Sequence, residues 1–221
     1  MRISSSESEV NEAVNINLVR CDDSGIPPAR MLEGITSLHR AAFPEFFLTS
    51  LGPRFLRLLY AGFISHPQGI CLVAEEEGAM IGFVAGTMSP SNFFGELLRR
   101  QALRFAISAI PGLLRSPLFA TRKCLGALFY RGEVPGGIPD AALLSSIAVS
   151  PATQSKGAGQ ALVQAFVEEV RMRGGTAIYL TTDESENERA NRFYAKCGFG
   201  LLDTFKRPGK RVMNRWIMKL T

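Results

Sequence analysis

Two kinds of hydrophobic pattern occur along this chain, one typical of strands and the other of helices. Alternating apolar residues predict a strand at 16–21, and short apolar runs predict strands at 69–88 (two strands with a tight turn), 142–149 and 177–183, and then a last hairpin across Pro208-Gly209. A period of three to four residues predicts helices, at 27–43, 50–65, 157–175 and 187–199. This order predicts a fold of the mixed α+β (α/β) class.

The segment 91–140 interrupts this alternation. We expect two amphipathic helices over 91–131, with a break near 110–112, and then a loop. The charges of the segment are mostly positive, which allows three interpretations: a solvated helical face, a lid over a binding site, or a patch that contacts an anionic membrane surface. The polar residues 1–14 are expected to form a flexible tail, so that 15–221 make one domain with a helical insertion at about 91–140.

The composition excludes several classes of protein. The chain has 221 residues, 46% of them hydrophobic, which suits one globular domain. Its net charge of +5 favours anionic partners, but the Lys and Arg residues are scattered and predict no nucleic-acid partner. The four cysteines lie far apart, which predicts reduced thiols in a cytoplasm and no metal site. No segment predicts an export signal or a membrane-spanning helix.

The sequence QSKGAG, residues 154–159, stands where the strand 142–149 gives way to a helix. A helix N-terminus has free N–H groups and a partial positive charge, so it binds phosphate readily. Gly157 and Gly159 let the main chain approach a bulky anion, and Lys156 adds a positive charge. The spacing fits neither the Walker motif nor the complete dinucleotide motif. Tight packing and an anion site are both compatible with this turn.

A second motif follows at a fixed distance. The order is a strand, the Q-x-x-G-x-G turn at 154–159, a long helix, the strand 177–183, and then N-x-x-A-x-x-F-Y-x-x-x-G-F at 187–199. In this order the chain resembles the GCN5-related N-acetyltransferase (GNAT) family over 142–199, whereas 91–140 lies outside the family pattern. The resemblance implies a GNAT-type fold, a central twisted mixed sheet flanked by helices, with acetyl-coenzyme A (acetyl-CoA) as the acyl donor.

The resemblance also assigns roles to individual positions. The turn that would hold the pyrophosphate of acetyl-CoA consists of Gln154, Ser155, Lys156, Gly157, Ala158 and Gly159. The positions whose main chain would pair with the pantetheine arm are Ile147, Ala148 and Val149. A gap between this strand and the strand 177–183 would make room for the arm. Asn187 would contact the arm, and Tyr194 would protonate the leaving thiolate.

Acetyl transfer to an amine makes chemical demands that agree with these roles. The amine must be neutral, and a lysine-like amine with a pKa of ~10.4 is almost entirely protonated at neutral pH. A phenol with a pKa of ~10 is a competent acid toward a thiolate within hydrogen-bond reach, which suits Tyr194. The N–H group of Val149 is expected to stabilise the oxyanion. No metal is required.

The general base is left open by the sequence. Many members of the family carry a glutamate at the start of the strand before the turn, but residues 141–149 contain no carboxylate. Ser145 or Ser146 could orient a water molecule, and Asp140 or Glu75 could act from nearby. An amine of low pKa could react through water alone.

Three of these residues also have purely structural interpretations. Tyr194 could be a core tyrosine, and Asn187 could be the N-cap of the helix that follows it. His39 is a lone histidine and is first expected to be structural, although the segment after it faces the acceptor site in the family.

The sequence therefore predicts a cytoplasmic, acetyl-CoA-dependent N-acetyltransferase that moves an acetyl group directly to an amine of a small molecule or an amino sugar. The alternatives are a CoA-binding sensor or partner-binding module without catalysis, and a protein N-acetyltransferase. A weak membrane-surface contact through 91–131 and a homodimer are further expectations.

Overall fold

The computed structural model describes residues 17–20, 29–115, 140–153, 157–207 and 211–220. Its strands are β1 (Asn17–Arg20), β2 (Gly69–Glu76), β3 (Ala79–Thr87), β4 (Ala142–Val149), β5 (Ala177–Asp183), β6 (Gly200–Lys206) and β7 (Val212–Lys219). Its helices are α1 (Ala29–Ala42), α2 (Phe47–Ser50), α3 (Pro53–Ser65), α4 (Pro90–Arg115), α6 (Ala158–Met172) and α7 (Glu188–Lys196), with a 3₁₀ turn at Pro151–Thr153.

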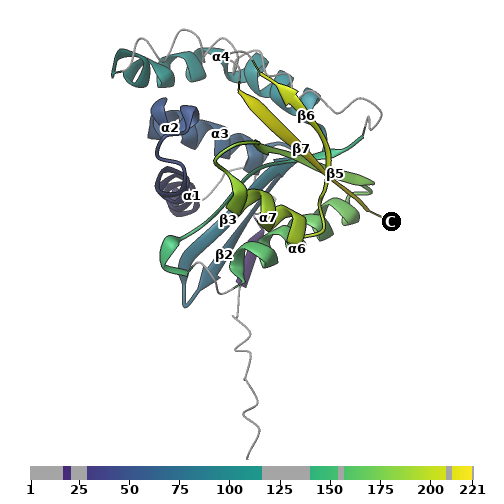
Figure 1. Ribbon diagram of the computed structural model, residues 1–221. Helices are drawn as coiled ribbons and strands as arrows, with labels where there is room; N and C mark the ends of the chain where they lie inside the picture. The colour runs from purple at the N-terminus through teal and green to yellow at the C-terminus, as the bar shows by residue number, and fades with distance from the viewer. Residues whose placement is uncertain (1–16, 21–28, 116–139, 154–156, 208–210, 221) are drawn as a thin grey trace, which may run out of the picture.

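The described strands form one seven-stranded sheet in the order β1-β2-β3-β4-β5-β7-β6. All neighbouring strands are antiparallel except β4 and β5, which run parallel. Helices cover both faces, with α1 and α3 on one side and α6 and α7 on the other (Figure 1). The predicted mixed sheet flanked by helices is confirmed.

Each face of the sheet has its own hydrophobic core. On one face Leu162 and Phe166 of α6 are fully buried against β2, β3 and β4. On the other face Tyr60 and Phe63 of α3 pack on Phe83 of β3, and the rings of Tyr60 and Phe83 lie 5.1 Å apart. The sheet is thus buried on both sides near its centre, where β3 and β4 run side by side.

The helix predicted at 50–65 begins three residues later in the structure, at Pro53. A short helix, α2, ends at Ser50, and α3 begins at Pro53 after Gly52, whose φ of 95° only glycine adopts without strain. Proline is favoured in the first turn of a helix because the missing N–H would have had no partner there.

The predicted break near 110–112 is also misplaced, because α4 changes direction at Gln101. The helix runs through Pro111, which is exposed, so water can satisfy the carbonyl group that a proline leaves unbonded. The buried hydrophobic residues of α4 stand four or eight residues apart: Phe93, Leu97, Phe105 and Ala109.

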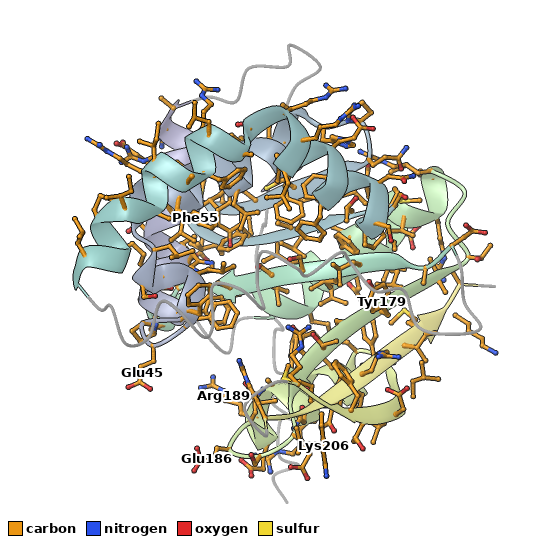
Figure 2. All side chains as sticks on the ribbon, turned by 90° about the horizontal axis from the view of Figure 1, so that it is seen from above. Glu45, Phe55, Tyr179, Glu186, Arg189 and Lys206 are labelled. Atoms are coloured by element: carbon orange, nitrogen blue, oxygen red, sulfur yellow. The ribbon has the colours of Figure 1, made fainter. Side chains whose placement is uncertain are left out.

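Each step of four residues turns a straight helix about 40° beyond a full turn, so a straight α4 would carry Ala109 away from the core. The change of direction at Gln101 keeps both halves on the protein. The rings of Phe55 from α3 and Phe105 from α4 lie 5.1 Å apart where the two helices cross (Figure 2).

Several expectations fall outside the described residues: the tail 1–14, the second half of the insertion at 116–139, and the turn at Pro208-Gly209. None of the helices in the described ranges has both the length and the apolar character that a membrane span requires.

Candidate functional site

The strands β4 and β5 separate along most of their length. Their parallel pairing is limited to Ala142 with Ile178 and Leu143 with Tyr179. Figure 2 shows Tyr179 on a strand near the middle of the sheet. By contrast, β4 stays paired with β3 to its end, and the N–H of Ser150 still donates to the carbonyl of Ile81 at 2.7 Å. The second half of β4 therefore has one free edge, and the predicted gap is confirmed.

A β-bulge at Ser145 begins this separation. The pairing between β3 and β4 passes from Gly86 with Leu144 to Ala85 with Ser146, which leaves Ser145 as the extra residue. A bulge bends a strand and reverses which face its next side chains occupy. Beyond it, Ile147 packs on the core beside α6, whereas Ala148 packs on the core beside α3.

The pairing also fixes the direction of the main-chain groups. In an antiparallel pair, hydrogen-bonded and non-bonded residues alternate. The N–H of Ser150 donates to β3, and every second residue before it has the same orientation. Ala148 and Ser146 therefore also turn their N–H and C=O groups toward β3. Ile147 and Val149 turn theirs toward the gap. Of the three positions expected to pair with the cofactor arm, only these two face the free edge.

The turn after β4 ends at Gly157, the N-cap of α6, in the left-handed conformation with a φ of 80°. The first bond within the helix runs from the N–H of Ala161 to the carbonyl of Gly157, at 3.0 Å. The N–H groups of 158–160 thus have no acceptor inside the helix. Gln154, Ser155 and Lys156 lie outside the described residues.

The two glycines of the turn differ in their surroundings. A Cβ atom added at Gly157 would meet nothing within 4 Å, so the main chain there borders open space. A Cβ added at Gly159 would lie 3.3 Å from Cζ of Phe193 and 3.7 Å from Cγ2 of Val149. Gly159 is therefore a packing residue between α6, α7 and β4, and Gly157 is the one that leaves the main chain accessible.

The helix α7 is positioned by a chain of hydrogen bonds. Nε1 of Trp216 on β7 donates to Oγ1 of Thr182 on β5 at 2.9 Å, and Thr182 donates to Oδ1 of Asn191 on α7 at 2.6 Å. Gly198, with a φ of 93°, ends α7. The N–H of Phe199 donates a hydrogen bond to the carbonyl of Tyr194 at 3.0 Å. The turn at Gly198 and Phe199 gives a structural reason for the last two residues of the second motif.

Tyr194 of α7 lies in the core, 9% exposed, between the rings of Phe193 and Phe199 at 5.3 and 5.9 Å. Burial, and secondarily Cys197, raises the pKa of its hydroxyl well above the ordinary value. The phenol is therefore protonated at any physiological pH. Asn187 is half-buried at the N-cap position of α7, but its side chain makes no capping hydrogen bond, so capping does not occupy this amide.

The candidates for the general base are spread apart. Asp140 is exposed at the opening of β4, six residues from Ser146, and an extended chain covers roughly 20 Å over that distance. Glu75 is on β2, which β3 separates from β4. Ser145 is exposed at the bulge. Only Ser146 belongs to a polar cluster.

That cluster contains a residue that the sequence did not indicate, Tyr60 of α3. Its hydroxyl is hydrogen-bonded to Ser146 of β4 and lies 2.6 Å from Nδ1 of His39 on α1. His39 is 1% exposed and Tyr60 is fully buried. Tyr60 falls within the helix predicted at 50–65, and no local signal connected it with His39.

Within the described ranges, no group of three or more His, Cys, Asp or Glu side chains is arranged to hold a metal ion. The groups that could hold a ligand are main-chain donors and acceptors at the free edge of β4 and at the start of α6.

Comparisons with known proteins identify this arrangement. The model of the acetyltransferase (GNAT) family matches residues 121–199. No curated protein sequence was found to match the chain. Solved structures with the same fold include a polyamine N-acetyltransferase from Drosophila melanogaster, 16% identical, with a TM-score of 0.58, covering 93% of this chain and 100% of that one.

Two further structures show the same likeness. The ribosomal-protein-S18-alanine N-acetyltransferase from Escherichia coli is 13% identical, with a TM-score of 0.56 and coverage of 92% and 93%. An aminoglycoside 6'-N-acetyltransferase in complex with coenzyme A is 14% identical, with a TM-score of 0.57 and coverage of 92% and 96%. The match over residues 121–199 and the shared fold identify a GNAT-type acetyltransferase domain in this chain, and acetyltransferases of this kind use acetyl-CoA as the acyl donor.

Proposed function

We propose that this enzyme transfers the acetyl group of acetyl-CoA directly to an amine of a small molecule or an amino sugar. The proposal rests on one observation: main-chain groups without a partner occur both at the free edge of β4 and at the start of α6, and the two places adjoin. The free edge of β4, at Ile147 and Val149, leads to the unbonded N–H groups at the start of α6. An amide-bearing arm that ends in a pyrophosphate matches both sets.

Each part of the donor has a proposed partner. The turn 154–159 holds the pyrophosphate, with the N–H groups of Ala158 and Gly159 as donors. Ile147 and Val149 pair with the amides of the pantetheine arm as a further strand would. Asn187, whose side chain is not used as a cap, contacts the arm near the start of α7. Of the free N–H groups, that of Val149 stabilises the oxyanion.

The reaction then requires one proton donor. The neutral amine attacks the thioester carbonyl, and a C–N bond forms as the C–S bond breaks. Tyr194 donates its hydroxyl proton to the departing sulfur. Its protonated state is secured by burial, which raises the pKa of this phenol.

Calorimetry with acetyl-CoA, followed by thioester consumption with a panel of amines, tests the proposal. The panel contains amino sugars, polyamines and peptides with a free N-terminus. Binding and turnover with small amines are expected. No binding of acetyl-CoA would overturn the proposal, and turnover of peptides alone would replace it with protein N-acetylation.

A second proposal concerns the outer surface of α4. Exposed apolar side chains form a stripe along it, at Leu103, Ile107, Ile110 and Leu114. Beside the stripe, a groove of about 420 Å³ between α1, α3 and α4 is lined by Arg54, Arg57 and Arg104 on an apolar floor. Apolar residues flanked by arginines are typical of helices that lie on anionic membranes. We propose that α4 contacts an anionic lipid surface.

Co-sedimentation with vesicles tests this contact. Vesicles of phosphatidylcholine with phosphatidylserine are expected to retain the protein, and those of phosphatidylcholine alone are not. The double variant Ile107→Ser, Leu114→Ser should lose binding. Met172→Ser, which also removes an exposed apolar side chain, but from α6, is the control. Equal partitioning of all variants would contradict the proposal, and a dimer in light scattering would assign the stripe to a second copy.

A further inference from the structure

The polar cluster of His39, Tyr60 and Ser146 joins three elements. Nδ1 of His39 on α1 lies 2.6 Å from the hydroxyl of Tyr60 on α3, and that hydroxyl is hydrogen-bonded to Ser146 on β4. The three groups form a linear chain of hydrogen bonds. Two of its members are buried in the core, and only Ser146 is partly exposed.

The exposed end of the chain lies at the place where transfer is proposed to occur. Ser146 directly follows the bulge and directly precedes Ile147, whose main chain faces the gap between β4 and β5. A carbonyl carbon held beside the main chain of Ile147 and Val149 is therefore close to the hydroxyl of Ser146. The side chain of Ser146 is on the face of the sheet that carries α1 and α3, opposite α6.

The buried end of the chain has unused polar atoms. Within the described residues, Nε2 of His39 and Oγ1 of Thr36 are buried and have no hydrogen-bond partner. They stand three residues apart on α1, so they lie on the same face of the helix. A buried polar atom without a partner costs about 1–3 kcal/mol, so two of them in one place point to a role beyond packing.

We propose that Ser146, Tyr60 and His39 form a chain that accepts the surplus proton of the amine as the amine is acetylated. The inference rests on the proposed function. Ser146 contacts the amine, and Tyr60 and His39 are positioning residues that act through it. The Nδ1 atom of His39 accepts the hydroxyl proton of Tyr60, the oxygen of Tyr60 accepts that of Ser146, and Oγ of Ser146 accepts a hydrogen bond from the amine N–H.

The proposed step balances. The amine lone pair forms the C–N bond, and the electron pair of the C–S bond leaves with sulfur, which takes a proton from Tyr194. The nitrogen gives its surplus proton to Ser146, while Ser146 passes its own to Tyr60 and Tyr60 passes its own to His39. Afterwards His39 releases one proton to solvent and Tyr194 takes up one from solvent. The net result is an amide and a thiol.

The chain also limits which amines are accepted. Burial lowers the pKa of His39 to about 4, so its ring is neutral and able to accept at neutral pH. Such a weak base does not take a proton from a free alkylammonium ion with a pKa of ~10.4. It does take one from the much more acidic N-acylated ammonium that forms as the thiolate leaves. The amine must therefore arrive neutral.

Steady-state kinetics of Ser146→Ala, Tyr60→Phe and the double variant test the inference. Each single variant is expected to lower kcat by about 10²-fold, with the Kd of acetyl-CoA within about twofold of the wild type. The double variant should lose no more than the single variants, because the chain acts as a unit. Ser108→Ala is the matched control, since Ser108 is a buried serine of α4 that donates to the carbonyl of Phe105 at 2.9 Å.

The outcomes separate this inference from the proposed function. Unchanged kcat in Ser146→Ala, with normal turnover by the wild type, would overturn the inference alone. Losses that multiply in the double variant, or an equal loss in Ser108→Ala, would also overturn it, since they indicate independent structural effects. Absence of wild-type turnover with every amine in the panel would overturn the proposed function and this inference together. Weakened binding of acetyl-CoA in Tyr60→Phe would show a misfolded site. In that case the kcat of Ser146→Ala decides whether the inference holds.

Discussion

Gly157 and Gly174 stand at the two ends of α6 with nearly the same conformation, at φ values of 80° and 77°. At neither position would a Cβ atom meet another atom within 4 Å. The two residues therefore have the same backbone strain and the same free space around Cα. They differ in that only Gly157 adjoins the proposed pyrophosphate site. At the residue scale, this pair separates a structural effect of glycine from a functional one.

Gly157→Ala is expected to weaken acetyl-CoA binding about tenfold or more, because the left-handed conformation costs an L-residue ~1–2 kcal/mol and its relaxation displaces the N–H groups of 158–160. Gly174→Ala carries the same strain and should lose similar stability without loss of affinity. Calorimetry and thermal unfolding of both variants measure the difference. Equal affinity in the two variants would refute the assignment of the turn.

Tyr194→Phe removes only a hydroxyl group and keeps the ring that packs on Phe193 and Phe199. We expect kcat to fall about 10²-fold and the Kd of acetyl-CoA to change little. The raised pKa of this phenol adds a pH test: its protonated form persists above the ordinary pKa of ~10, so the wild type should show no alkaline loss of kcat from this group below about pH 10. Equal losses in rate and affinity would argue against the acid role.

At the scale of elements, α4 is joined to the rest of the molecule by close packing as well as by apolar contacts. A Cβ atom added at Gly112 would lie 2.3 Å from the carbonyl oxygen of Ser50 and 2.7 Å from Cα of Leu51. Gly95, in the first half of the same helix, is exposed and has nothing within 4 Å of that position. The backbone of α4 therefore lies against the turn between α2 and α3 at Gly112, whereas Gly95 faces open space.

The same substitution should consequently act in opposite directions along α4. Gly95→Ala is expected to stabilise the protein by about 0.5–1 kcal/mol, because alanine favours a helix over glycine. Gly112→Ala is expected to destabilise it by about 1–3 kcal/mol, since the contacts are with main-chain atoms that cannot rotate away. Urea unfolding gives both values. A destabilisation of equal size at the two positions would contradict the described docking of α4.

At the scale of the whole molecule, the gap between β4 and β5 interrupts the hydrogen bonding of the sheet. Main-chain groups inside a buried sheet are normally hydrogen-bonded, so a free edge in the middle of the sheet leaves such groups without partners from the neighbouring strand. A ligand that completes the sheet from within should stabilise the entire fold, because it binds only the folded state.

Acetyl-CoA at 100 times its Kd is expected to add ~2.7 kcal/mol to the stability of the folded state, seen as a higher Tm. Hydrogen exchange locates the effect. In the free protein, the N–H groups of Ile147 and Val149 should exchange faster than that of Ala148, which bonds β3. The ligand should slow the first two and leave the third unchanged. Slowing of all three alike, or a constant Tm, would disagree with binding in the gap.

The elements follow largely from local sequence. Strands such as 177–183, the ends of α6 and the hairpin turn at Glu77-Gly78 were predictable, because period, capping glycines and turn residues act over a few neighbours. The family was recognisable for the same reason, since its two motifs are short and contiguous. The break in α4 was not predictable, because it depends on where α3 lies and not on Pro111.

The features of the candidate site also fall into two groups, those with a local sequence signal and those that depend on tertiary structure. Gly157, Asn187 and Tyr194 could be proposed from the sequence alone, because the loop and helix ends that carry them have strong local signatures. The separation of β4 from β5, the direction of the main chain at Ala148, and the joining of His39 to Tyr60 and Ser146 were decided only by the tertiary structure. Pairing register and contact between distant segments depend on the packing of the whole sheet, and no window of neighbouring residues contains that information.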